Sequence, residues 1–115
     1  MAYDEEELAG RARTTLQDVV GDGTTVVEKR LFGGVGFLVA GNMAVGVQKE
    51  SLLVRLPPGD AEHALTEPGA RPFEMGGRGP SKGWLLVDAP GTDGDADLRR
   101  WVERGAAYAL SLPPK

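Results

Sequence analysis

Apolar residues recur every three or four positions near both ends of the chain and form short strand-like runs between them. The spacing over residues 4–20 predicts an amphipathic helix that ends at a Gly-Asp-Gly sequence. The same spacing predicts a second long helix that begins near residue 93 or 95 and ends at Pro113. Gly105 lies within the apolar stripe of this second helix, which predicts a close approach to the rest of the fold.

The region after the first helix has the character of an antiparallel meander. Its apolar, β-branched and aromatic runs fall at residues 24–27, 35–39, 45–47 and 52–54. The breaks between these runs fall at residues 33–34, 40–43 and 48–51. Each break is short enough for a hairpin turn, so consecutive runs are expected to pair as neighbouring strands.

The second half of the chain alternates helix and strand signals. Residues 60–65 predict a short helix capped by Asp60, and residues 71–75 predict an edge strand because Pro72 cannot donate to a central ladder. Residues 76–83 are rich in glycine and predict a loop before a buried strand at residues 84–87. The expected fold is a two-layer α+β domain, with a mostly antiparallel sheet of five to six strands packed by the N- and C-terminal helices.

Length and composition limit the chemistry that is open to this chain. Its 115 residues fit one domain over residues 1–115, with no repeat or linker. Cysteine is absent and there is one histidine, which excludes thiol catalysis, thiolate zinc sites and the usual imidazole clusters. We therefore expect no metal or other cofactor, and we expect a cytoplasmic protein.

The net charge of -4 comes from a single acidic run near the start of the chain. Residues 4–7 contribute four negative charges, and the rest of the sequence sums to zero. Acids in a first helical turn compensate the helix dipole, so this run is expected to begin the first helix. The chain has no signal-peptide pattern and no apolar stretch near the roughly 18 residues that span a bilayer, so we expect no membrane association.

A set of short motifs, in a fixed order, resembles the TfoX N-terminal domain family. The motifs are Glu28-Lys29-Arg30-Leu31-Phe32-Gly33-Gly34, Gly41-Asn42-Met43, Arg71-Pro72-Phe73, Lys82-Gly83-Trp84 and the segment 101–112. The resemblance covers nearly the whole chain and implies an α+β fold of the secretion-chaperone-like type. In the competence regulators of this family the domain is joined to a separate C-terminal domain. No such domain follows here, so we expect a stand-alone module rather than a transcriptional co-activator.

The glycine-rich segment before Trp84 is the stretch most like an anion site. It departs from a phosphate-binding P-loop because serine precedes Lys82 and glycine follows it, while Pro80 removes one backbone donor. Arg71, Arg78 and Lys82 nevertheless predict a cationic rim beside Trp84 that binds an anion or an acidic partner. The alternative is a hairpin loop whose cations are only solvated.

Other motifs in the sequence lack the spacing that their chemistry needs. Phe32, Gly33 and Gly34 do not fit the dinucleotide-binding pattern, so the glycines predict a bulge or tight bend, with a binding groove as the alternative. The acids at residues 93–97 begin like a calcium loop, but Leu98 and Arg104 stand at the sixth and twelfth positions, where that loop needs glycine and glutamate. The acids therefore predict helix capping. His63 has no nucleophile-elbow serine to act on, which indicates a surface residue.

Three functions remain open from the sequence. The leading hypothesis is a non-enzymatic binding or regulatory module that acts through protein contacts. The second is a nucleic-acid accessory that uses Arg71, Arg78 and Lys82, with binding that falls as salt rises. The third is an enzyme with a carboxylate base near the loop before Trp84. A homodimer is also predicted, because an open sheet leaves at least one strand edge unpaired.

Overall fold

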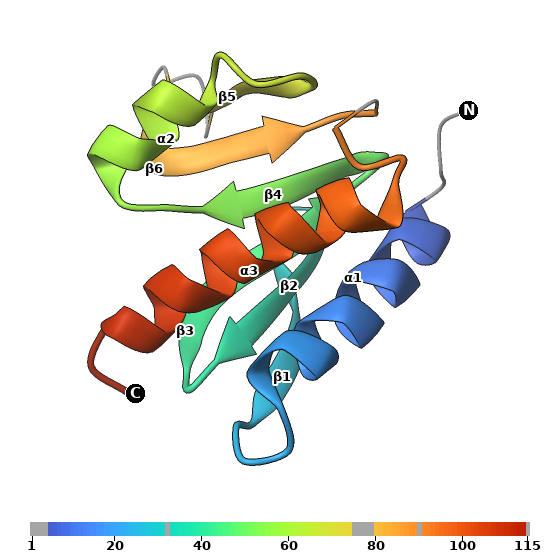
Figure 1. Ribbon diagram of the computed structural model, residues 1–115, viewed down its shortest axis with the longest axis vertical. Coiled ribbons are helices and arrows are strands. Elements are labelled where there is room, and N and C mark those ends of the chain that lie inside the picture. Colours follow the sequence, from blue (N-terminus) through green and yellow to red (C-terminus); the bar gives the residue numbers. More distant parts are fainter. Residues whose placement is uncertain (1–4, 32, 75–79, 90, 115) are drawn as a thin grey trace.

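The protein is an open antiparallel sheet with all three of its helices on one face (Figure 1). A computed structural model describes residues 5–31, 33–74, 80–89 and 91–114. The strands are β1 (Val26–Leu31), β2 (Gly34–Val39), β3 (Asn42–Gln48), β4 (Ser51–Arg55), β5 (Ala70–Glu74) and β6 (Pro80–Val87), in the order β1-β2-β3-β4-β6-β5. The helices are α1 (Glu5–Val20), α2 (Pro58–Ala64) and α3 (Asp95–Ser111). The predicted α+β class and the antiparallel sheet are confirmed.

Helix α1 begins and ends as its sequence predicts. Glu5, Glu6 and Glu7 occupy its first turn, where the unpaired N–H groups and the helix dipole favour negative charge. Gly21 ends the helix with a φ of +77°, and its N–H donates to the carbonyl oxygen of Gln17 at 3.0 Å. Asp4, the first residue of the predicted helix, lies outside the described residues.

The meander is confirmed, but its first strand is longer than the apolar pattern indicates. β1 continues through Glu28, Lys29 and Arg30 because all three pair with β2 in unbroken register. The β2–β3 turn places Ala40 and Gly41 at φ values of 51° and 83°, the left-handed pair that a two-residue hairpin favours. A charged run can therefore form a strand where one side of that strand faces solvent.

Two boundaries in the second half differ from the prediction. α2 begins at Pro58 and has no side-chain cap, so Asp60 lies in its first turn and the predicted cap is wrong. Proline at the helix start lacks the N–H that a cap would satisfy. β6 begins at Pro80, so the predicted loop is wrong over residues 80–83, and its residues 76–79 lie outside the described residues. Gly83 has a φ of +82°, and a Cβ there would lie 2.8 Å from the carbonyl oxygen of Leu56, so glycine here serves a strand.

The main core lies between the helices and the sheet. Leu52 and Val54 of β4 point into it, and Trp101 of α3 is fully buried there. Leu53, between those two strand residues, points to the opposite face, which none of the three helices covers. We call this side the helix-free face. Its buried residues are Met43, Leu53, Phe73 and Leu86, with Leu38 and Trp84 packed against them.

Candidate functional site

Trp84 lies on the helix-free face of β6 and is half-buried between two other side chains. Its ring centroid is 6.3 Å from that of Phe73, and the guanidinium carbon of Arg55 lies 5.4 Å from the centroid of the Trp84 ring. Arg55 is the last residue of β4 and pairs with Trp84 across the β4–β6 ladder. The same guanidinium lies 5.5 Å from the ring of Tyr108 on α3. Two aromatic rings therefore hold one cation by cation–π contacts at the end of the sheet.

Arg55 differs from every other arginine that the structure describes. The other seven each form an ion pair with a carboxylate, and they are Arg11, Arg13, Arg30, Arg71, Arg99, Arg100 and Arg104. Arg55 forms none with any residue in the described ranges and is half-buried. Its positive charge is thus oriented by the fold without being neutralised by it.

A hollow of about 340 Å³ adjoins Tyr108 on the side of α2 and α3. Its wall residues are Leu56, Pro57, Asp60, Arg104, Ala107, Tyr108 and Ser111. The wall is mostly apolar, and Arg104 is already paired with Glu67 at 2.8 Å. We call Arg55, Trp84, Tyr108 and this hollow the Arg55 site. It combines an aromatic surface, an unneutralised cation and space for an apolar side chain.

Arg71, which the sequence predicts to bind an anion or acidic partner, takes part in a polar ladder. The ladder joins Arg71 of β5 to Ser51 of β4 and to Asp88, which directly follows β6. The Arg71 Nε donates to Asp88 Oδ2 at 2.7 Å, and its terminal nitrogen donates to Ser51 Oγ at 3.1 Å. Ser51 Oγ in turn donates to Asp88. Partial burial alone would raise the pKa of Asp88, but the hydrogen bonds from Arg71 and Ser51 and the charge of Arg71 outweigh it and lower the pKa. Asp88 thus has the properties of an ion-paired structural carboxylate rather than of a general base.

Arg71 and Trp84 share the helix-free face but do not converge. Asp88, which holds Arg71, lies four residues along the chain from Trp84, or roughly 13 Å at the rise of a strand. A second hollow, of about 480 Å³, lies beside Arg71 and includes Lys49, Glu50, Ser51 and Asp88. Its two cations are matched by two carboxylates, so it offers no net charge to a ligand.

The remaining predicted site residues divide into two groups. Phe32 and Arg78 lie outside the described residues, and Lys82 is placed only by its backbone, in β6. Gly33 has a φ of +77° in the β1–β2 turn, and a Cβ on Gly34 would lie 2.0 Å from the carbonyl oxygen of Val47. Gly33 thus supplies the positive φ of the turn and Gly34 the close approach of two backbones, which agrees with the predicted tight bend.

The comparisons with known proteins give one result. The family model of the TfoX N-terminal domain matches residues 18–109, which is most of the chain. This chain belongs to the TfoX N-terminal domain family. No curated protein and no solved structure matches it. The expected resemblance is therefore confirmed, and any closer statement about this TfoX N-terminal domain must come from its own residues.

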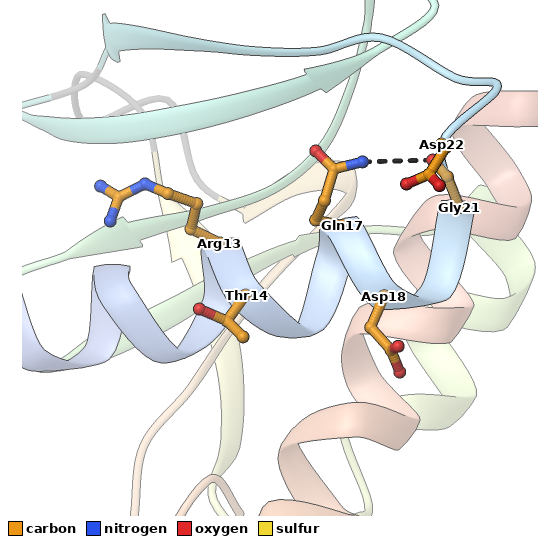
Figure 2. A pocket seen from close by; sticks show the side chains of 6 residues that line it. All are labelled: Arg13, Thr14, Gln17, Asp18, Gly21 and Asp22. Carbon is orange, nitrogen blue, oxygen red and sulfur yellow. Dashed lines mark hydrogen bonds between the residues drawn. The ribbon is translucent and has the colours of Figure 1, made fainter.

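A third hollow in this TfoX N-terminal domain lies along α1 and has a volume of about 710 Å³ (Figure 2). Figure 2 shows Arg13 and Gln17 leaving one side of the helix while Thr14 and Asp18 leave the other. Gln17 donates to the carbonyl oxygen of Gly21 at 3.1 Å, Arg13 pairs with Glu28, and Asp18 pairs with Arg99. Its side chains diverge and its main charges are matched within the fold, so it is a weaker candidate than the Arg55 site.

Metal and membrane signals are absent from the part of the chain that the structure describes. Within the described ranges, no group of three or more histidine, cysteine, aspartate or glutamate residues is placed to hold a metal ion. No helix there is both long enough and apolar enough to cross a membrane.

Sequence reasoning placed Trp84 in the site but missed Arg55 and Tyr108. The predicted apolar run covers residues 52–54 and ends before Arg55. Tyr108 lies 53 residues further along the chain, and nothing in the sequence indicates that the two residues meet. The only local signal is that Arg55 closes a strand of buried apolar residues. An arginine at that place is partly desolvated and needs a partner, which aromatic rings supply here.

Proposed function

We propose that this TfoX N-terminal domain is a non-enzymatic protein-binding module that captures an acidic partner at the Arg55 site. The observation that carries the proposal is the position of Arg55 between Trp84 and Tyr108 with no carboxylate partner in the described residues. A partner carboxylate can approach a guanidinium that the rings already orient, so little side-chain freedom is lost on binding.

The composition of the Arg55 site supports the same proposal. Tryptophan, tyrosine and arginine are the residues most enriched at energetic hot spots of protein interfaces. All three meet here, beside a hollow of about 340 Å³ that accepts an apolar side chain. The expected partner segment therefore carries a glutamate or aspartate for Arg55 and, close to it, an aliphatic residue for the hollow.

A binding titration with defined probes tests this proposal. The first probe is a fluorescein-labelled peptide of alternating glutamate and leucine, followed by anisotropy at low salt. Wild-type protein is expected to bind it saturably, and Arg55→Gln to weaken binding by at least about tenfold. Lys49→Gln is the matched control, because it removes one exposed cation from the β3–β4 hairpin and is expected to change the affinity less than about twofold.

Three results would overturn the proposal. The first is equal affinity of wild type and Arg55→Gln for the peptide. The second is no saturable binding of the peptide up to about 1 mM, the weak limit of specific recognition. The third is tighter binding of a second probe, labelled oligothymidine, with an affinity that falls steeply as salt rises. That outcome favours the nucleic-acid hypothesis and adds base stacking on Trp84 to the cations that the hypothesis invokes.

A further inference from the structure

Strand β1 forms one edge of the sheet, and its outer side is open among the described residues. It is first in the strand order, and Val27, Glu28, Lys29 and Arg30 are all exposed. Val27 is 42% exposed, one of the two large apolar side chains with such exposure in the described part of the chain. An open edge of this kind can accept a further strand by main-chain hydrogen bonds.

The register of the β1–β2 hairpin shows which backbone groups face outward. Ala40 donates to the carbonyl oxygen of Thr25, which makes this the hydrogen-bonded pair next to the Val26–Val39 pair. Hydrogen-bonded and non-hydrogen-bonded pairs alternate along an antiparallel ladder. The N–H and C=O groups of Val26, Glu28 and Arg30 therefore point away from β2.

The opposite edge of the sheet is less suited to accept a strand. β5 contains Pro72, which has no N–H to donate, and the N–H of Ala70 already donates to the carbonyl oxygen of Glu67 at 3.1 Å. Of the two edges, β1 thus offers the more complete row of donors and acceptors.

We propose that two copies of this chain pair through antiparallel β1 strands, with Lys29 opposite the partner's Lys29 at the two-fold axis. Glu28 then lies opposite the partner's Arg30, and Arg30 lies opposite the partner's Glu28. Both residues have their backbone groups directed outward, so the same pairs carry the main-chain hydrogen bonds. The proposal is independent of the Arg55 site, whose strand residues lie on β4 and β6, three and four strands away from β1 in the sheet.

Charge complementarity favours this register over the two that are centred on the neighbouring charged residues. A two-fold axis perpendicular to the sheet sets one residue opposite its own copy, because facing side chains must lie on the same side of the sheet. An axis at Glu28 sets two glutamates opposite each other, and an axis at Arg30 sets two arginines opposite each other. An axis at Lys29 opposes one pair of like charges but creates two pairs of opposite charge.

Side-chain placement supports the Glu28–Arg30 pairing. Val26 packs against the main core, so Glu28 and Arg30, at alternate positions, lie on the same helix-bearing side. Arg13 and Glu5 of α1 pair with them there, which confirms the side. The Arg30 side chain is 86% exposed and that of Glu28 is 42% exposed, so both remain accessible to a second copy.

Charged edge strands usually prevent unwanted pairing, and β1 fits that rule with one exception. A strand whose charges share one sign repels its own copy in every register, whereas the charges of Glu28, Lys29 and Arg30 disfavour the registers centred on Glu28 and Arg30 and favour the one centred on Lys29. The opposite charges of Glu28 and Arg30 on the same side of β1 thus make one register more favourable than its neighbours.

Charge reversal with mixing tests the proposal by sedimentation equilibrium. Wild type is expected to form a dimer, whereas Glu28→Arg and Arg30→Glu are each expected to weaken it by at least about tenfold because like charges then face each other twice. A 1:1 mixture of the two variants restores two opposite-charge pairs and is expected to form a heterodimer. Glu50→Lys, on the β3–β4 hairpin, is the matched control and is expected to leave the dimer unchanged.

The mixing experiment also shows whether a variant fails to dimerise because it is unfolded. Glu28→Arg removes the ion pair with Arg13, and Arg30→Glu removes the pair with Glu5, so thermal melts of each variant are recorded alongside. Recovery of dimers on mixing two folded variants cannot come from stability alone. A third variant, Lys29→Gln, removes the repulsion at the axis and is expected to tighten the dimer roughly two- to fivefold.

Amide hydrogen exchange identifies the edge directly. The N–H groups of Glu28 and Arg30 are expected to exchange fast in dilute protein and slowly at dimer-forming concentrations, whereas that of Lys29 is protected by β2 at both. A monomer at all concentrations up to about 1 mM overturns the proposal. So does a dimer in which Glu28 and Arg30 stay unprotected, because it must form through another surface.

Discussion

Gly105 of α3 lies directly against Ala44 of β3. A Cβ on Gly105 would lie 2.6 Å from the Ala44 carbonyl oxygen and 2.8 Å from a methyl carbon of Val45. The absence of a side chain at this one position lets α3 approach the sheet closely enough to bury Trp101 completely. The height of the helix above the sheet, and with it the place of Tyr108 beside Arg55, depends on this contact.

The variant Gly105→Ala is therefore expected to destabilise the domain although alanine favours helices. The gain in helix propensity is about 1 kcal/mol, whereas forcing a methyl group against backbone costs about 1–3 kcal/mol. We expect a net loss of up to about 2 kcal/mol in the free energy of unfolding, measured by urea denaturation. Gly10→Ala in α1 is the matched control, because nothing lies within 4 Å of its Cβ position, and it is expected to stabilise by up to about 1 kcal/mol. Equal effects of the two variants would contradict the role of Gly105.

Trp101 supports a second prediction about the same contact. Its side chain is fully buried and the indole Nε1 has no hydrogen-bond partner in the described structure, while Arg104 lies 4.5 Å from its ring centroid. A buried unpaired donor costs about 1–3 kcal/mol. Trp101→Phe loses packing volume but removes that donor, so its cost is expected to be less than about half that of Trp101→Ala, which should reach about 3–5 kcal/mol.

The comparison of these two Trp101 variants decides whether the indole N–H is satisfied. Chemical denaturation of both proteins measures the two costs on one scale. If Trp101→Phe proves as costly as Trp101→Ala, the indole N–H contributes to stability and the view that it is an unpaired donor is wrong.

The ladder of Asp88, Arg71 and Ser51 predicts an acid-dependent loss of stability. The folded state lowers the pKa of Asp88 below its ordinary value of 3.8. A lowered folded pKa means that the stabilisation is fully present above the unfolded pKa and is lost as pH falls through the folded pKa. The contribution of Asp88 is thus expected to be constant above about pH 5 and to decline below about pH 4.

The matched variant for this prediction is Asp88→Asn, which keeps the shape of the side chain but cannot titrate. Its melting temperature is expected to lie below that of wild type near neutral pH, and the gap is expected to close as pH falls below about 4. Melts at several pH values measure the gap. A gap that is constant down to about pH 2 would show that the charge of Asp88 does not stabilise the fold.

The sequence was most informative where one residue has one physical role. Gly21 ends α1 because few other residues accept a φ of +77°, and Gly105 was expected to touch the sheet because it interrupts an apolar stripe. The reading failed at Gly83, where glycine suggested a loop but the backbone of Leu56 requires a glycine within a strand. Glycine is typical both of turns and of close backbone contacts. Which of the two applies depends on the neighbouring strand, which the local sequence does not show.

The candidate site was less predictable for a different reason. Arg71 and Trp84 stood out because they belong to a locally cationic or aromatic segment, yet Arg71 is matched by Asp88 in the fold. Arg55 and Tyr108 come from a strand and a helix that the topology alone brings together. Pairing between charges is a property of three-dimensional neighbours, so a free cation cannot be identified by counting charges along the chain.

The turn glycines Gly33 and Gly34 give the last prediction, which separates a structural role from a binding groove. A Cβ on Gly34 would lie 2.0 Å from the Val47 carbonyl oxygen, so Gly34→Ala must displace the backbone of β2 or β3 and is expected to cost at least about 3 kcal/mol. Gly33 has a φ of +77° with open space around it. Gly33→Asn is therefore expected to cost less than about 1 kcal/mol, since asparagine tolerates that conformation, whereas Gly33→Val is expected to cost more. Unfolding free energies that rank Gly34→Ala above Gly33→Val, and both above Gly33→Asn, indicate that the two glycines shape the hairpin. If Gly34→Ala is as stable as wild type, Gly34 is not required for the hairpin, and the alternative of a binding groove at Gly33 and Gly34 is favoured.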